Sequence, residues 1–492
     1  MADDVETKIN EGTLTAAPQL ANIENDPDFE AYKDVMTVRA EFLGQPPQRN
    51  YRYEKYPYHG RLFPLSIMNR SHTLVEMGDI DRYMAIDDKI NALPKKSLSK
   101  PDIIIRKMME WLKREMAAVK KHKTVSTKGK VVITMLTWGK EYADKTLNYS
   151  FKSMMADGNL PVLCKSKFVI MYVQTNEEGR AHLEASPIVA AMKEIGVHFE
   201  YTLVDPEVLA GIAEGREELY WMVGAAASLA IHYAKKNGAA FHHSYPDCLY
   251  SDHYFYEILR LAAVHKNILI PCATADETTL FPLLQPYEDE KKIAVPAADL
   301  VALTLNAVHL TLWTMMVNNR PSNWLYPQNY VLLWESEDQL HINSPHVNAA
   351  WICEESLAAT PDRFFRTLDS ELDMLCPGYD FYIPQETDNI YMAGLASQSR
   401  YSINDFFVTE KETGAHIWRN VGHRDLMKFF FNGAKFRINR EVRPMPANAI
   451  PNPQIAAEKT YLFNSIMCCD PYAGVQFAQP RTDASGVFAS VR

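Results

Sequence analysis

Short apolar runs alternate with helical patterns of apolar residues through the middle of the chain. The runs predict strands at 130–136, 168–173, 197–204 and 239–242. The segments between them predict helices at 142–155, 186–195 and 220–236. Strands that alternate with helices indicate an α/β fold with a mostly parallel sheet.

The segment 130–136 (KVVITML) is nearly continuous in apolar residues, a pattern typical of a strand buried on both faces. We therefore expect this strand at the centre of the parallel sheet. Later strands are predicted at 268–271, 330–334, 380–383 and 390–393, and a long apolar helix at 295–317. The last two strands could extend the same sheet.

An amphipathic helix is predicted at 99–121, because its apolar residues recur three and four positions apart. The helix lies in the most basic part of the chain, since Lys95 to Lys130 holds 12 Lys and Arg against 3 Asp and Glu. The whole chain, in contrast, has a net charge of −10. The local charge suits either attraction to an anionic surface or an ordinary solvated helix face.

Four regions are predicted along the chain. Residues 1–28 form a flexible acidic N-terminus, 29–127 an α-helical region, 128–400 the α/β domain and 401–492 a C-terminal extension with a proline-rich arm. A tyrosine-rich run at 51–59 (YRYEKYPYH) offers aromatic surface for docking. Because extended arms lose entropy on ordering unless they dock, we expect a homo-oligomer in which one arm reaches another subunit.

The composition is that of a globular protein, with 47% hydrophobic and 23% charged residues, and it excludes disorder as a global description. The negative net charge argues against a nucleic acid as partner. Seven scattered cysteines suit a reducing compartment, and residues 1–29 contain no apolar run of a signal peptide, so we expect the cytoplasm. No transmembrane segment is expected, because the apolar stretch 295–317 contains Asp299, Asn306 and His309.

Polar residues that follow the predicted strands are the first candidates for a site, because parallel sheets bind ligands at the carboxyl ends of their strands. The richest cluster is 242–253 (HHSYPDCLYSDH). Asp247 and Asp252 on one turn could hold Mg²⁺ or Mn²⁺, or they could cap a turn and a following helix. Strand alternation predicts that one of His242 and His243 points into the core and the other outward.

Several segments resemble a known family. The run 137–163 (TWGKEYADKTLNYSFKSMMADGNLPVL) resembles the opening of a family of bacterial proteins with the glycosyltransferase A fold, a nucleotide-diphospho-sugar transferase-like sheet. The segment 246–252 (PDCLYSD) is similar to the acidic metal-binding motif of that family, and 341–346 (HINSPH) and 367–369 (TLD) follow in a similar order. The likeness spans about residues 130–397.

The resemblance implies transfer of a sugar from a nucleotide-sugar donor to an unknown acceptor. Thr137, Trp138, Tyr142 and Asp205 would bind the donor. Asp247, Asp252 and His346, or His341 in its place, would hold a divalent cation, Mn²⁺ or Mg²⁺. Asp369 would act as a base on the acceptor.

Two other functions fit the same residues. A non-catalytic structural or assembly protein could use a glycosyltransferase-like fold as a binding surface, with its arms wrapped around a neighbouring subunit. A metal-dependent hydrolase could be built on the cluster of His and Asp at 242–253. Binding of nucleotide sugars would distinguish the transferase from both alternatives.

Overall fold

The structure is a computed structural model, and it describes residues 80–81, 84–85, 88, 100–124, 129–212, 216–307, 309, 331–336, 339–343, 347–365, 381–384, 386–397 and 434–437. The chain divides into two compact units. The first comprises Met1–Lys113, Pro206–Ala225 and Asp362–Arg366, and the second comprises Arg114–Asp205, Ala226–Pro361 and Thr367–Arg492. The predicted docking arms at 51–59 and 441–453 lie outside the described residues, so the homo-oligomer stays a prediction.

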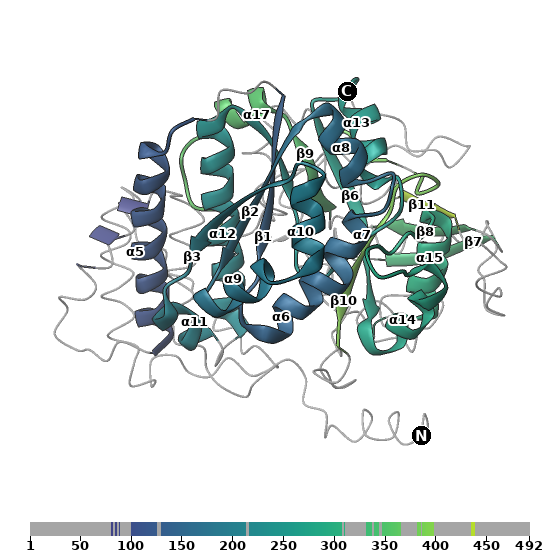
Figure 1. Ribbon diagram of the computed structural model, residues 1–492, viewed down its shortest axis with the longest axis horizontal. Coiled ribbons are helices and arrows are strands. Elements are labelled where there is room, and N and C mark those ends of the chain that lie inside the picture. The colour runs from purple at the N-terminus through teal and green to yellow at the C-terminus, as the bar shows by residue number, and fades with distance from the viewer. Residues whose placement is uncertain are drawn as a thin grey trace, which may run out of the picture. The chain divides into compact units, whose positions relative to one another are not determined.

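The second unit contains an eight-stranded, mostly parallel sheet that confirms the α/β class (Figure 1). Its strands, in spatial order, are β3 His198–Leu203, β2 Phe168–Thr175, β1 Lys130–Leu136, β4 Ala239–His243, β9 Val347–Ile352, β6 Asn267–Asp276, β10 Met392–Ala396 and β5 Cys248–Tyr250. The strands β3, β2, β1 and β4 are all parallel to one another. β9 is antiparallel to both of its neighbours, β10 is parallel to β6, and β5 is antiparallel to β10.

The prediction for the first strand is confirmed. β1 has the predicted bounds, pairs in parallel with β2 on one side and β4 on the other, and is buried at all seven residues. The next three predicted strands are also present, with ends that differ by one or two residues. The strand predicted at 268–271 is the start of the longer β6, and 390–393 overlaps β10, which joins the same sheet as expected.

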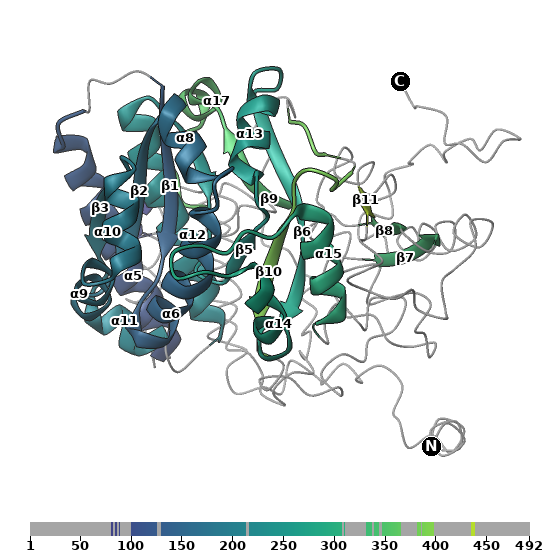
Figure 2. The same ribbon diagram turned by 45° about the vertical axis from the view of Figure 1, so that its right-hand side comes forward.

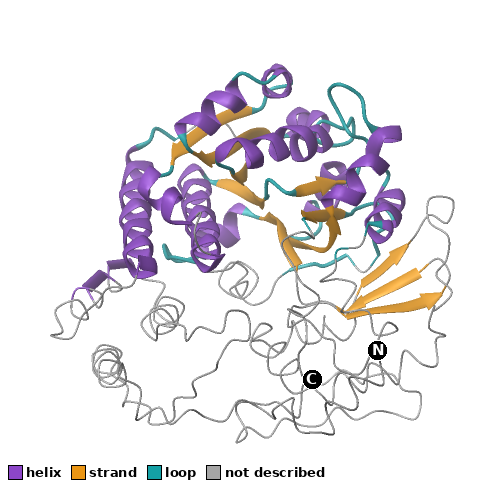
Figure 3. Cartoon of the chain, turned by 90° about the horizontal axis from the view of Figure 1, so that it is seen from below, coloured by secondary structure: helices purple, strands orange, loops and turns teal. Residues whose placement is uncertain are grey.

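One face of the parallel strands is covered by short helices. These are α8 Leu160–Ser166, α9 Glu177–Glu184, α10 Pro187–Glu194 and α13 Tyr254–Ala262. Their apolar side chains form one core with Val131, Ile133 and Met135 of β1. Figure 3 shows helices on both sides of the strands of this sheet. Burial of this apolar surface is the main source of stability for the unit.

The opposite face of β1 and β2 is covered by the part of α12, Arg216–Asn237, that belongs to the second unit, from Ala226 onward. The ring of Tyr172 on β2 stacks on Tyr233 of α12, with centroids 4.4 Å apart, and Gln174 Nε2 donates to the Ala226 carbonyl oxygen at 3.2 Å. Because both faces of the sheet are covered, successive residues of a strand are buried alternately on its two sides. The prediction that one of His242 and His243 points outward is therefore wrong, since both side chains are buried.

A second core lies on β5, β6 and β10. It is formed with α14 Glu277–Leu284 and α15 Ala297–Asn306, joined by the short helix η3 Gln285–Tyr287. The long helix predicted at 295–317 ends at Asn306 in the structure, and residues 310–317 lie outside the described residues. Among the helices that the structure describes, none is long and apolar enough to span a bilayer.

A separate three-stranded sheet in the second unit has the order β11-β8-β7 (Figure 2). Its strands are β7 Val331–Ser336, β8 Gln339–Asn343 and β11 Ala434–Arg437, and they are antiparallel. β7 corresponds to the strand predicted at 330–334. The helix α17, Glu354–Ala359, follows β9 of the main sheet.

The first unit contains α11, Pro206–Ile212, and the residues of α5, Lys100–Lys121, up to Lys113. α5 confirms the helix predicted at 99–121. A Cβ atom placed on Gly211 would lie within 2.5 Å of two Ile104 side-chain carbons, so glycine permits the close packing of these two helices. Lys107 and Glu207 form an ion pair across the same contact.

Candidate functional site

The carboxyl ends of β3, β2, β1 and β4 lie along one edge of the sheet, which is here named the carboxyl edge. The parallel register aligns Leu136 with Gln174 on β2 and Thr175 with Leu203 on β3. The chain continues this alignment past the strands, because Thr137 N donates to the Gln174 carbonyl oxygen at 2.9 Å. The residues after each strand are therefore close together, as the sequence predicts.

Two aromatic side chains occupy this edge directly after β1. Trp138 precedes α6, Gly139–Lys145, and its ring stacks on Tyr142 with centroids 5.4 Å apart and an interplanar angle of 30°. Both residues are only partly buried, so part of each ring is open to a ligand. Gly139 has φ of 66°, a left-handed conformation that lets the chain turn from β1 into the helix at no steric cost.

Thr137 does not take the predicted position in a donor site. Its side chain is fully buried, and its Oγ1 accepts a hydrogen bond from Thr146 Oγ1 at 3.1 Å. Thr146 begins the π-helical segment η2, Thr146–Phe151, which continues α6 and leads into the short helix α7, Lys152–Met154. Thr137 therefore supports the turn beneath the two aromatic rings and does not line the open surface.

A lysine that the sequence did not single out lies beside the aromatic pair. Lys145 Nζ is 5.5 Å from the centre of the Tyr142 ring and forms ion pairs with Glu277 at 2.8 Å and Glu141 at 3.2 Å. Burial by itself lowers the pKa of this ammonium, but the two carboxylates outweigh burial and raise it. Glu277 follows β6, so the rule that polar residues follow strand ends would have found it if applied to that strand as well.

Asp205 lies at the end of β3, one residue beyond Val204, and is partly buried. Val204 N donates to the Thr175 carbonyl oxygen at 2.7 Å, which fixes the chain beside the end of β2. Two strand spacings, about 10 Å, separate the ends of β3 and β1 in the sheet. A nucleoside could span that distance between Asp205 and Trp138.

Asp247 lies on a turn between β4 and β5. Three backbone carbonyl oxygens of this turn accept hydrogen bonds from other parts of the chain. The Ser150 hydroxyl lies 2.8 Å from the carbonyl oxygen of Pro246 and 2.7 Å from that of Cys248, and it shares its proton between them. Leu395 N donates to the carbonyl oxygen of Asp247 itself at 2.7 Å. The carboxylate is partly buried, on a backbone that is fixed before any ligand binds.

Asp252 is not on the same turn as Asp247, contrary to the prediction. The strand β5 lies between them and separates the two residues by about 10 Å or more. Asp252 Oδ1 accepts hydrogen bonds from Gly158 N at 3.1 Å and His253 N at 2.9 Å, and Oδ2 is 3.1 Å from His253 Nδ1. Nor does Asp252 cap a helix that begins at His253, because α13 begins at Tyr254. Asp252 instead holds the loop at the far end of β5.

The described residues do not fit a preformed site for a divalent cation. No group of three or more His, Cys, Asp and Glu in the described part of the chain is placed to hold a metal. His242 is buried among aromatic rings, and burial followed by the charge of His243 lowers its pKa to about 3. His346 and Asp369 lie outside the described residues, and His341 belongs to β8 of the small sheet.

The segment 137–163, on which the family resemblance is based, supports the loop around β5. Asn159 is fully buried, and its Nδ2 donates to the carbonyl oxygens of Ser153 at 2.8 Å and Ser251 at 2.9 Å. Its Oδ1 accepts from Phe255 N at 3.0 Å. With Ser150 at one end of β5 and Asn159 at the other, this segment fixes both turns of the candidate site.

Comparison with known proteins finds no family model that matches the chain and no curated protein that is significantly similar to it. The function therefore has to be inferred from the residues of the carboxyl edge.

Proposed function

We propose that the chain binds a nucleotide-activated sugar at the carboxyl edge of β3-β2-β1-β4 and transfers the sugar to an acceptor, on a fold of the glycosyltransferase A type. The observation that carries this proposal is the stacked, partly open pair Trp138 and Tyr142 immediately after the central strand. Open α/β sheets bind ligands at this position, and an exposed aromatic face is suited to a nucleobase.

Two residues of the carboxyl edge have a matching part in such a ligand. The Trp138 ring stacks on the base, and the Asp205 carboxylate accepts hydrogen bonds from ribose hydroxyls. Lys145 lies beside Tyr142, but its ion pairs with Glu277 and Glu141 already compensate its charge, so it supplies no net positive charge for the diphosphate. The turn with Asp247 faces the same edge, because it follows β4, which pairs directly with β1.

Of the three predicted metal ligands Asp247, Asp252 and His346, this proposal keeps Asp247 alone. Asp252 does not share its turn, and the other predicted ligand, His346, lies outside the described residues. Binding of nucleotide sugars with and without Mn²⁺ measures the contribution of a cation directly.

Burial of His242 and His243 disfavours a hydrolase that uses either ring, because neither can reach a substrate. The third histidine of the cluster, His253, is exposed, and its Nδ1 lies 3.1 Å from Asp252 Oδ2. The non-catalytic alternative, a structural or assembly protein, predicts no binding of nucleotide sugars. Calorimetric titration with UDP-, GDP-, CMP- and dTDP-sugars, each with and without Mn²⁺, separates this alternative from the transferase.

The titration compares wild type with Trp138→Ala and Trp138→Phe, and with Tyr256→Ala as a matched control. Tyr256 is an exposed aromatic residue on α13, with 47% of its surface accessible, and it lies outside the carboxyl edge. Loss of stacking costs about 1–3 kcal/mol, or about 5- to 150-fold in Kd, so Trp138→Ala should bind correspondingly weaker. Trp138→Phe should retain most of the affinity, and Tyr256→Ala should bind as wild type does. Absence of binding by wild type, or equal binding by all variants, would overturn the proposal.

A further inference from the structure

The parallel strands begin at the edge of the sheet opposite the carboxyl edge, which is here named the amino edge. Each of β1, β2, β3 and β4 follows a helix, and each helix carries lysine in its last turn or just beyond it. A lysine is favourable there because the carboxyl end of a helix carries a partial negative charge. Because the strands are parallel, all of these helix ends meet at the amino edge. The lysines are Lys120, Lys121 and Lys123 before β1, Lys165 before β2, Lys193 before β3, and Lys235 and Lys236 before β4.

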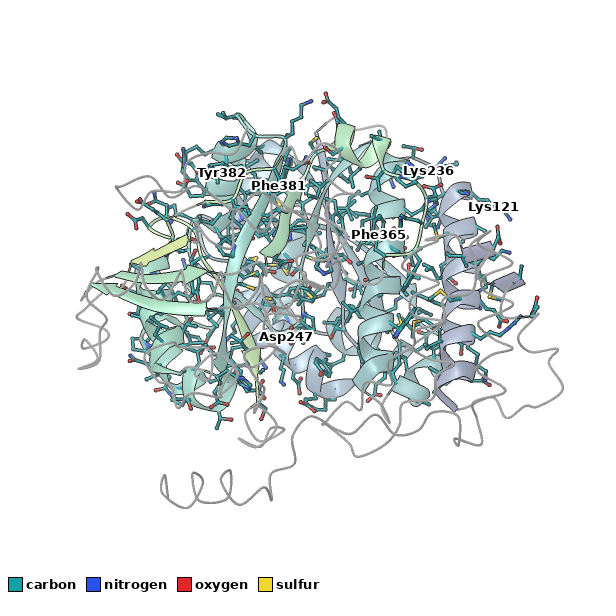
Figure 4. All side chains as sticks on the ribbon, turned by 180° about the vertical axis from the view of Figure 1, so that it is seen from behind. Lys121, Lys236, Asp247, Phe365, Phe381 and Tyr382 are labelled. Atoms are coloured by element: carbon teal, nitrogen blue, oxygen red, sulfur yellow. The ribbon has the colours of Figure 1, made fainter. Side chains whose placement is uncertain are left out.

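Two of these helix ends are in direct contact. The His122 ring, directly after α5, meets the Tyr233 ring of α12 edge to face, with centroids 6.5 Å apart. The ends of α5 and α12 therefore lie side by side at the amino edge. Figure 4 shows Lys121 and Lys236 there, at the opposite end of the sheet from Asp247. The amino edge is thus a surface separate from the proposed donor site.

The amino edge of the second unit has a surplus of positive charge. Two exposed carboxylates share this edge, Glu194 at the end of α10 and Glu354 at the start of α17, and Glu355 is paired with Lys266 at 3.1 Å. Five exposed lysines outnumber the two carboxylates, so anions are attracted to this edge. These lysines form no ion pair with any residue in the described part of the chain, and they are Lys121, Lys123, Lys165, Lys193 and Lys236.

An apolar side chain is exposed at the same edge. Val264 lies in the loop between α13 and β6, and 78% of its surface is accessible. β6 runs in the same direction as β4, because both are antiparallel to β9, so the loop before β6 belongs to the amino edge. Exposed lysines together with an exposed aliphatic side chain match the interface of a bilayer, where charged headgroups lie above the acyl chains.

We propose that the amino edge binds the surface of a membrane that contains anionic phospholipids, with the lysines on the headgroups and Val264 at the boundary of the acyl chains. The starts of β3, β2, β1 and β4 span three strand spacings, about 14 Å, so the lysines spread over an area that fits many headgroups better than a single phosphate. Binding in this direction leaves the carboxyl edge toward the solvent. The inference does not depend on what binds there.

Co-sedimentation of the full chain with lipid vesicles tests this proposal. One set of vesicles is phosphatidylcholine alone, and the other is an equal mixture of phosphatidylcholine and phosphatidylglycerol. The chain should bind the mixed vesicles at least tenfold more tightly than the neutral ones. Binding should also fall when NaCl is raised from about 50 to 500 mM, because salt screens the charges of exposed lysines.

The variant that tests the surface is Lys121→Gln combined with Lys236→Gln. Each lysine contributes about fivefold to binding of an anionic bilayer, so the pair should lose about 25-fold in partition coefficient. The matched control is Lys140→Gln with Arg180→Gln, two cations on α6 and α9 that are each paired with a carboxylate of the same helix, and it should bind as wild type does. Val264→Ser should weaken binding and leave its dependence on salt unchanged, because this substitution removes apolar surface and no charge.

A nucleic acid is the other macromolecule that such a charge would attract, so a labelled duplex DNA is titrated under the same conditions. Binding of DNA in the absence of vesicle binding would overturn the proposal and assign the lysines to a phosphate backbone. The proposal is also overturned if wild type binds both kinds of vesicle equally or not at all, or if the double lysine variant binds the mixed vesicles as wild type does. None of these results depends on nucleotide-sugar binding at the carboxyl edge.

Discussion

Substitution of Asn159 by Ala is the most direct test of how the candidate site is supported. The side chain is fully buried and makes three hydrogen bonds to the backbone of three other residues, at 2.8, 2.9 and 3.0 Å. Alanine removes all three and leaves two carbonyl oxygens and one N–H inside the protein without this partner. No exposed route lets water replace them readily, because Ser251 and Phe255 are themselves buried.

The expected cost follows from the number of bonds. A buried hydrogen bond contributes about 0.5–1.5 kcal/mol net, so three of them contribute about 1.5–4.5 kcal/mol. Asn159→Asp should cost at least as much at neutral pH. A carboxylate can still accept from Phe255 N, but it cannot donate to the two carbonyl oxygens and it places a buried negative charge against them. The order wild type, Ala, Asp in decreasing stability is therefore the specific expectation.

The assay is equilibrium unfolding in urea, followed by circular dichroism and tryptophan fluorescence. Asn148→Ala is the matched control, since Asn148 is an exposed asparagine eleven positions earlier, on η2, and such surface substitutions change stability by less than about 0.5 kcal/mol. An Asn159→Ala protein within about 0.5 kcal/mol of wild type would show that the three bonds do not hold the loop.

Three further substitutions give separate tests. Asp247→Ala should abolish calorimetric binding of nucleotide sugars in the presence of Mn²⁺ and change the urea midpoint little, because the Ser150 hydroxyl and Leu395 N hold the turn at backbone carbonyl oxygens that the substitution keeps. Gly158→Ala should lower stability by about 1–3 kcal/mol in urea, because the new Cβ would lie 2.6 Å from His253 Cα, a backbone atom that cannot move aside cheaply. His242→Leu should flatten the dependence of stability on pH. Burial holds the pKa of His242 at about 3 against 6.5 in the unfolded chain, so wild type loses up to about 1.4 kcal/mol per pH unit as pH falls below 6.5, and the leucine variant does not bear this loss.

For each of these three substitutions, the opposite result would contradict the reason given for it. A normal Kd for Asp247→Ala would remove this carboxylate from the donor site. Unchanged stability of Gly158→Ala would mean that a Cβ atom at position 158 lies farther than 2.6 Å from His253 Cα. Equal pH profiles for wild type and His242→Leu, measured in urea at about pH 7 and pH 5, would mean that the histidine is protonated inside the protein.

The parallel half of the sheet could be predicted because its strands are buried on both faces. β1 and β2 are nearly continuous in apolar residues, which is the sequence signal of strands covered by helices on each side. Because both faces of the sheet are covered, the prediction that one of His242 and His243 points outward is wrong. Strand alternation separates the two rings correctly onto opposite faces, but it does not reveal that both faces are covered.

The antiparallel strands could not be predicted in the same way. β9 reaches its place between β4 and β6 from about a hundred residues further along the chain than β4, and only the folded sheet shows this insertion. β5 has three residues, too few for any periodic pattern. The short strand is also the reason that Asp247 and Asp252 seemed to share one turn, when they lie at its opposite ends. The ion pair of Lys145 with Glu277 joins residues 132 positions apart, so neither residue alone indicates it.

The positions on which the family resemblance is based differ in how much they indicate about sugar transfer. Ser150 and Asn159 hold the backbone on the two sides of β5, and a chain with this fold needs them whether or not it transfers a sugar. A non-catalytic protein of the same architecture would therefore resemble the family at those positions just as closely. Trp138 and Asp247 are instead proposed to contact the nucleotide sugar, so substitutions at these two positions test the transferase and not the scaffold. Paired measurements on Asn159→Ala and Asp247→Ala separate the two roles, since the first should lower stability and the second should mainly change binding.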